Sequence, residues 1–162
     1  MKAFIGDMKK YPFSVLTGVN TLFNGLLNQE AFRALDFSKL KVTVGGGMAV
    51  QRATAEAWFE LTGCTLVEGY GLTESSPVLT CNPTDGTLQL GSIGVPVSST
   101  EISIRDDDGN VVPDGEPGEI WGKGPQVMLG YWERPEETAK TMEGEWLKTG
   151  DVGQLLDTGF YR

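Results

Sequence analysis

The stretch Glu68-Gly-Tyr-Gly-Leu-Thr-Glu74 decides how this chain is interpreted. It follows the short apolar run Thr65-Leu-Val, which predicts a β-strand, and ligands of open α/β sheets bind outside the carboxyl ends of the strands. Its glycines let a ligand approach the backbone closely, and Tyr70 between them offers a flat aromatic face. Thr73 adds a hydroxyl donor, and Glu74 adds a hard oxygen ligand of the kind that Mg²⁺ prefers. The whole string predicts a nucleotide site, whereas Gly-Tyr-Gly alone is typical of an ordinary turn.

The residues before this motif alternate between strand and helix patterns. An apolar stripe predicts a helix over residues 20–27, and residues 40–44 predict a strand that ends on Gly45-Gly46-Gly47. Residues 49–61 predict a further helix, which is closed by Gly63. Strands joined through a helix are usually parallel, so both glycine clusters are expected at one edge of the sheet. The triple glycine would let an aromatic ring or an acyl group lie against bare backbone, or it is simply a flexible turn. No Lys-Ser or Lys-Thr follows it, which excludes a Walker phosphate loop.

After residue 90 the pattern changes to short strands separated by turns. Residues 101–105 alternate polar and apolar side chains, Asp106–Asn110 predicts a turn, and Val111-Val resumes the apolar run, which together indicate a hairpin. Residues 118–124 predict another strand, and residues 135–142 a short helix with proline in its first turn. The fold class is therefore predicted as α/β plus β: part of a parallel α/β sheet over residues 1–90, followed by a small, β-rich, barrel-like subdomain over residues 91–162.

The stretch Trp146-Leu-Lys-Thr-Gly-Asp151 supplies a third candidate for chemistry. An aspartate behind a Thr-Gly turn could accept hydrogen bonds from vicinal ribose hydroxyls, as an acid does in dinucleotide folds. The alternative is an ordinary turn. The run Asp106-Asp107-Asp108 lacks the ligand spacing of a calcium loop and indicates a solvated hairpin tip.

Composition excludes several classes of function. The 162 residues carry 13 basic and 22 acidic side chains, a net charge of −9, and no histidine. This balance argues against a nucleic-acid partner, and the missing histidine excludes Ser-His and Cys-His pairs and histidine metal sites. Cys64 and Cys81 are expected to be small buried side chains in a reducing compartment. No run approaches the roughly 20 apolar residues of a membrane span, so a cytoplasmic location is expected, with peripheral association at the inner membrane face left open.

Taken in order, these motifs resemble those of the adenylate-forming acyl-CoA synthetases. The segments that carry the resemblance are Gly45-Gly46-Gly47, EGYGLTE at 68–74, GSIG at 91–94, GEIWGKGPQVMLGYW at 118–132 and WLKTGD at 146–151. Within that family, GVNTLFNGLLNQ at 18–29 and KGPQVMLGYW look most like bacterial long-chain fatty-acid–CoA ligases. The resemblance covers nearly the whole chain. Since family members run to several hundred residues, the chain is expected to be a central piece of the family's large N-terminal domain.

The resemblance implies an activity and a role for each matching residue. Such enzymes join a fatty acid to ATP, forming an acyl-adenylate and pyrophosphate, and then transfer the acyl group to the thiol of CoA. Tyr70 would stack on adenine, Asp151 would bind the ribose hydroxyls, Thr73 would bind the α-phosphate and Glu74 would hold Mg²⁺. Thr73 and Glu74 would be the catalytic pair, because this chemistry needs positioning and charge neutralisation and no general base. Gly47 and Leu72 would form the acyl entrance. The full nucleotide-binding set implied is Gly46, Gly47, Glu68, Gly69, Tyr70, Gly71, Thr73 and Asp151.

Some family features are missing from these 162 residues. The glycine- and serine/threonine-rich phosphate loop and the C-terminal lid, each with its lysine, are absent, so the isolated chain is expected not to form acyl-adenylate. Lys148 stands where long-chain members often have histidine, and Glu145 separates Gly144 from Trp146. Two other interpretations stay open. One is a piece of another adenylating enzyme, such as an aromatic-acid ligase, a luciferase-like enzyme or a peptide-synthetase adenylation domain; the other is a non-enzymatic β-rich interaction module. The incomplete sheet also predicts self-association through exposed strand edges.

Overall fold

Strand β3 (Leu66–Gly71) passes from one unit of the chain into another in the computed structural model, which describes all 162 residues. The first unit consists of Met1–Glu68 and Pro83–Gly91, and the second of Gly69–Asn82 and Ser92–Arg162. The predicted boundary near residue 90 therefore differs from this division, because residues 69–82 fold with the β-rich part. The reason is strand pairing: the end of β3 forms antiparallel pairs with the strand that follows it.

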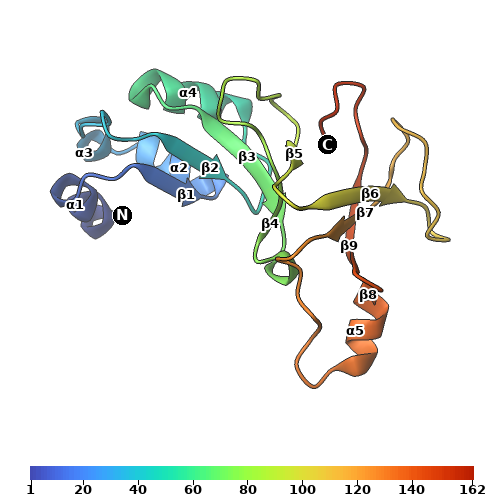
Figure 1. Ribbon diagram of the computed structural model, residues 1–162. Helices are drawn as coiled ribbons and strands as arrows, with labels where there is room; N and C mark the ends of the chain where they lie inside the picture. Colours follow the sequence, from blue (N-terminus) through green and yellow to red (C-terminus); the bar gives the residue numbers. More distant parts are fainter. The chain divides into compact units, whose positions relative to one another are not determined.

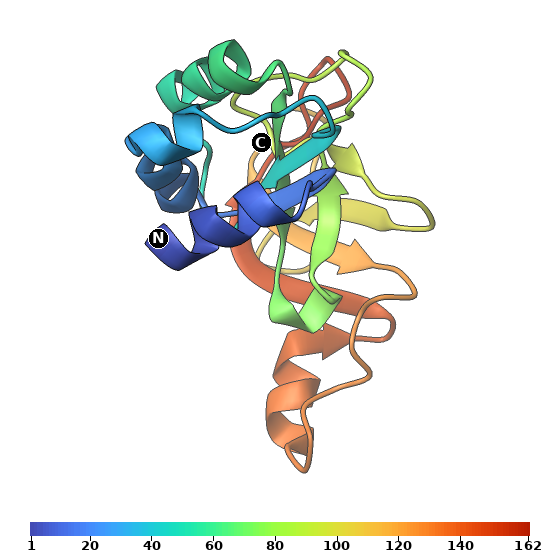
Figure 2. The same ribbon diagram turned by 90° about the vertical axis from the view of Figure 1, so that its left-hand side faces the viewer.

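The first unit is an α/β layer in which the predicted parallel strands are present (Figures 1 and 2). Strand β2 lies between β1 and the start of β3, and its partners run parallel to it. The predicted helices over 20–27 and 49–61 are confirmed as α2 and α4, although α4 begins at Arg52. Gly63 closes α4 in the left-handed conformation, as predicted. The elements of this unit before β3 are α1 (Lys2–Lys10), β1 (Val15–Gly18), α2 (Asn20–Leu27), α3 (Glu30–Arg33), β2 (Val42–Gly45) and α4 (Arg52–Thr62).

Three fully buried aromatic rings form the centre of the first unit's core. Phe23 meets the ring of Trp58 edge-on with centroids 4.9 Å apart, and Phe32 stacks on it at 5.5 Å. The indole Nε1 of Trp58 donates to the hydroxyl of Thr43 at 3.3 Å, so the polar end of this buried ring has a partner. Cys64 is buried against the same hydroxyl, which fits its predicted packing role.

The second unit contains the remaining strands, and all of its strand pairs are antiparallel. The end of β3 pairs with β4, and β4 pairs with β5. A separate, curled sheet has the order β6-β7-β9-β8, which agrees with the predicted β-rich, barrel-like part (Figures 1 and 2). The elements of the second unit after β3 are η1 (Thr73–Ser75), β4 (Val78–Cys81), β5 (Val95–Pro96), β6 (Glu101–Arg105), β7 (Gly118–Lys123), α5 (Pro135–Thr141), β8 (Met142–Glu143) and β9 (Trp146–Gly153).

The hairpin predicted after β6 forms only in part. Its turn is present, and Asp106 N–H donates to the carbonyl of Asn110 at 2.9 Å. The return arm is a single bridge between Arg105 and Val111, and the true partner of β6 is β7. Pro113 follows closely and has no N–H to continue a ladder, which explains why the arm stops. None of the helices has the length and apolar character needed to cross a membrane.

Candidate functional site

The Glu68–Gly71 part of the motif lies inside strand β3. The prediction that it follows the strand was therefore wrong. Glu68 is opposite Gly45 of β2, whereas Gly69, Tyr70 and Gly71 are opposite residues of β4. Strand β3 pairs first with the parallel strand β2 and then with the antiparallel strand β4. This pairing extends β3 through Gly69 and Gly71, although glycine by itself is a poor strand former. A register irregularity falls between Tyr70 and Gly71, where the chain leaves the strand.

In the first unit, Gly46 and Gly47 lie at the same edge of the sheet as Glu68. Gly46 and Gly47 follow the end of β2 directly, and Gly45 is the register partner of Glu68. Gly47 has φ +74°, a conformation that favours glycine. The Glu68 carboxylate accepts the backbone N–H of Val50 at 3.3 Å. Its half-burial raises the pKa of Glu68, and the Val50 hydrogen bond acts in the opposite direction. The common edge predicted for Gly46, Gly47 and Glu68 is thus present.

In the second unit, Tyr70 and Asp151 meet directly. The Tyr70 hydroxyl donates to Asp151 Oδ2 at 2.7 Å, although the two residues are 81 positions apart. Burial is the main cause that raises the pKa of Tyr70, and the hydrogen bond to Asp151 raises it further. The hydroxyl is therefore protonated at neutral pH and serves as a donor. The residue predicted to stack on adenine and the residue predicted to bind ribose are therefore in direct contact.

Asp151 is positioned by a bulge in β9, and not by the predicted turn. The register of β7 and β9 shifts where Ile120 faces the segment Thr149–Asp151. The Thr149 hydroxyl donates to the Ile120 carbonyl at 2.7 Å, and Gly150 adopts φ +75°. Bulges of this kind redirect a side chain and are frequent beside active sites. Here the bulge exposes the Asp151 carboxylate.

Thr73 and Glu74 lie on the short helix η1, which follows β3. Ser75 fixes this turn, because its hydroxyl accepts the N–H of Leu72 at 3.0 Å and donates to a backbone carbonyl. Thr73 is exposed, and Glu74 is partly buried. The Glu74 Oε1 atom accepts the hydroxyl of Tyr131 at 2.8 Å, and this bond raises the pKa of Tyr131.

A cavity of about 350 Å³ joins these elements within the second unit. Its volume lies in the range of small-molecule pockets. Leu72 and Glu74 line one part of it, and Thr149 and Gly150 of the bulge line another. Of the predicted site residues, Leu72 and Glu74 line this cavity, whereas Tyr70, Thr73 and Asp151 do not. Gly46, Gly47 and Glu68 belong to the first unit. Three lining residues that sequence reasoning did not single out are Glu119, Tyr131 and Thr149. Each lies within or beside a motif quoted above, which is the signal that could have found them.

A family model for AMP-binding enzymes matches residues 1–132. The chain belongs to the AMP-binding enzyme family. The motif of β3 and η1 falls inside the matched residues, as does Tyr131, while Asp151 lies beyond them.

Curated relatives show which AMP-binding enzymes the chain is similar to in sequence. The chain is 56% identical over 158 residues to a long-chain-fatty-acid–CoA ligase of Yersinia pestis, covering 98% of this chain and 28% of that protein. It is 52% identical over 94% of its length to one of Haemophilus influenzae. A feruloyl-CoA synthase of Amycolatopsis is 33% identical over 98% of this chain. The chain thus spans a little over a quarter of the length of the ligases that it matches.

Solved structures confirm the fold expected for an AMP-binding enzyme. An anthranilate–CoA ligase in complex with anthranoyl-AMP has a TM-score of 0.90 at 30% identity, covering 99% of this chain and 31% of that one. The N-terminal domain of FACL13 from Mycobacterium tuberculosis has a TM-score of 0.86 at 26% identity, covering 98% of this chain and 40% of that one. The α/β plus β class is therefore that of the N-terminal part of adenylate-forming enzymes.

The acidic side chains of this chain do not form a cage for a metal ion. No group of three or more Cys, Asp or Glu side chains is arranged to hold one. Mg²⁺, however, is commonly held by one or two carboxylates together with the phosphates of a substrate. Glu74, a single partly buried carboxylate on the cavity wall, fits that second arrangement.

Proposed function

We propose that this chain forms the nucleotide site of a long-chain-fatty-acid–CoA ligase, which makes acyl-CoA, AMP and pyrophosphate from ATP, a fatty acid and CoA. The observation that carries the proposal is the contact of Tyr70 with Asp151 beside the cavity that Glu74 lines. An aromatic face, a diol-binding carboxylate and a phosphate-side carboxylate are the groups that an adenylate requires. The identity to long-chain ligases, 52% or more in two organisms, supports the acyl class over the feruloyl-type alternative at 33%.

In this proposal Asp151 changes partner when the nucleotide binds. Its carboxylate would accept the ribose hydroxyls in place of the Tyr70 phenol, and the released ring would lie against the adenine. The Tyr70–Asp151 hydrogen bond gives each group a protein partner before the nucleotide binds. The nucleotide replaces one charge-assisted hydrogen bond with two, which favours binding.

Thr73 and Glu74 would act on the phosphates. The exposed Thr73 hydroxyl is free to donate to the α-phosphate, and Glu74 would hold Mg²⁺, which neutralises phosphate charge. Tyr131 would keep the Glu74 carboxylate oriented through its 2.8 Å hydrogen bond. The attack of the fatty-acid carboxylate brings it close to the α-phosphate, which is also an anion. Groups that are positioned to neutralise charge make this approach possible.

The remaining proposed roles fall to glycines and Leu72. The roles that the resemblance gives to Gly46, Gly47 and Glu68 of the first unit are part of this proposal, as are those of Gly69 and Leu72 of the second unit. We also propose a cytoplasmic protein that can collect its substrate at the inner membrane face, on the strength of the resemblance to bacterial ligases.

The central test is titration calorimetry of AMP with the purified chain. Replacing Tyr70 or Asp151 with alanine is expected to weaken AMP binding roughly 10- to 100-fold, the usual cost of losing a hydrogen bond to a charged group. Asp157→Ala is the matched control, since Asp157 is an exposed aspartate outside the site. No heat with AMP, together with no effect of Tyr70→Ala, would favour the non-enzymatic module instead.

Self-association is a second expected property of the isolated chain. Strand β1 is the outer strand of the first unit's sheet, and its residue Val15 is 54% exposed. An uncovered strand edge offers unpaired N–H and carbonyl groups to a second copy. Val15→Lys is therefore expected to convert dimers to monomers in light scattering, whereas Val111→Lys, a change at an exposed residue of the isolated bridge to Arg105, is not. A strictly monomeric wild-type chain at high concentration would contradict this expectation.

A further inference from the structure

The side chain of Glu119 links the Asp151 bulge to the centre of the second sheet. Its Oε1 atom accepts the backbone N–H of Gly150 at 2.8 Å, and its Oε2 atom accepts the indole Nε1–H of Trp121 at 2.8 Å. Each oxygen of one carboxylate thus holds a different donor. Glu119 also lines the cavity that Glu74 and the bulge share.

The bulge needs such an acceptor. A bulge leaves the extra residue outside the ladder, so the Gly150 N–H has no cross-strand carbonyl. Gly150 is exposed, and Glu119 gives its N–H a partner within the protein in place of the missing ladder partner. Because Gly150 directly precedes Asp151, this bond also limits where the Asp151 carboxylate can point.

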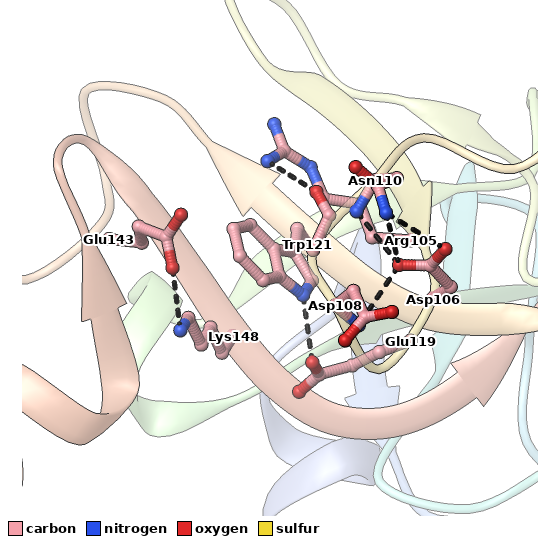
Figure 3. A network of polar contacts seen from close by, with 9 residues as sticks. Arg105, Asp106, Asp108, Asn110, Glu119, Trp121, Glu143 and Lys148 are labelled. Carbon is pink, nitrogen blue, oxygen red and sulfur yellow. Dashed lines mark hydrogen bonds and ion pairs between the residues drawn. The ribbon is translucent and has the colours of Figure 1, made fainter.

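The other end of the link is rigid. The Trp121 ring is only 2% exposed and contacts two cations, Arg105 at 4.3 Å and Lys148 at 4.8 Å from the ring centroid. Lys148 is in turn paired with Glu143 at 2.7 Å. Figure 3 shows this network, with the Glu119 carboxylate below the indole nitrogen. Burial and two neighbouring cations fix the position of the Trp121 ring. The hydrogen bond from its Nε1 atom therefore fixes the Glu119 carboxylate.

We propose that Glu119 is a positioning residue for ribose recognition: it holds the Gly150 N–H so that Asp151 faces the ribose hydroxyls of the nucleotide. This inference rests on the proposed function, because it concerns the ligand of Asp151. In this proposal Glu119 acts on the ribose through Gly150 and Asp151.

The substitution Glu119→Gln tests the link with little change in side-chain size. A glutamine has one carbonyl oxygen and one NH₂ group, so it can accept from Gly150 or from Trp121 but presents a donor to the other. The ligands are AMP and 2′,3′-dideoxy-AMP, which lacks the ribose hydroxyls. Wild type is expected to prefer AMP by ~10-fold or more, and Glu119→Gln is expected to reduce that preference to within ~2-fold while its affinity for the dideoxy ligand stays nearly unchanged. Glu116→Gln, an equal charge change at an exposed glutamate, is expected to keep the wild-type preference.

Two further measurements separate the possible failures. Asp151→Ala is expected to lose the preference for AMP as well. If the wild-type chain shows no preference for AMP, the proposed function fails. The role of Glu119 is then tested by the rate of hydrogen exchange at the Gly150 amide. That exchange is expected to accelerate in Glu119→Gln and not in Glu116→Gln. An equal loss of affinity for both ligands in Glu119→Gln would reduce Glu119 to a general structural role. A wild-type preference in Glu119→Gln, or an unchanged Gly150 exchange rate, would overturn the inference.

Discussion

Replacing Trp58 with alanine is expected to lower the free energy of unfolding of the first unit by about 3–5 kcal/mol, the usual cost of truncating a large aromatic side chain in a core. The ring is fully buried between Phe23 and Phe32. The truncation removes both ring contacts and leaves a cavity that neighbours on two helices cannot fill. It also removes the donor to Thr43, whose hydroxyl is fully buried.

Urea unfolding followed by far-ultraviolet circular dichroism measures this loss without relying on tryptophan fluorescence. Phe59→Ala is the matched control, because Phe59 is the next residue of helix α4 and is 54% exposed. Its loss is expected to stay below about 1 kcal/mol. A similar loss for both variants would mean that Trp58 is not the centre of this core.

The alternation of helices and strands in the first unit could be predicted because its signals are local. The stripe of α2 repeats at helical spacing, and the strand before Gly45 is short and apolar. Gly63 marks the end of α4 by a conformation that glycine adopts most easily. Such features depend on residues a few positions apart, and the sequence displays them directly.

The details of the site could not be predicted in the same way, since they depend on partners far away in the chain. The turn expected at Thr149–Asp151 is a bulge only because β7 faces it. Tyr70 and Asp151 are 81 positions apart, and Tyr131 and Glu74 are 57 positions apart. The motifs identified which residues matter, and the antiparallel pairing of the second unit decides which of them touch.

The second large effect is expected at Gly71, where β3 passes its neighbour most closely. A Cβ atom on this residue would overlap the carbonyl oxygen of Pro77 and would lie 2.8 Å from its carbonyl carbon and 2.9 Å from the Cα of Val78. All three atoms belong to the backbone, so no side-chain rotation relieves the overlap. Gly71→Ala must therefore move β4, and it is expected to destabilise the second unit by more than about 3 kcal/mol.

The same displacement is expected to abolish AMP binding, because Tyr70 and Glu74 lie on either side of Gly71 in the chain and are placed by the β3–β4 pairing and the turn after it. Urea unfolding and AMP titration of Gly71→Ala measure both effects. Gly6→Ala is the control for the loss of a glycine, since nothing lies within 4 Å of a Cβ there and alanine favours the helix. If Gly71→Ala unfolded at the wild-type urea concentration and bound AMP normally, β3 and β4 would be able to move apart and admit the added Cβ atom at little cost. The close approach of Gly71 to the Pro77 carbonyl would then limit neither the stability of the second unit nor AMP binding.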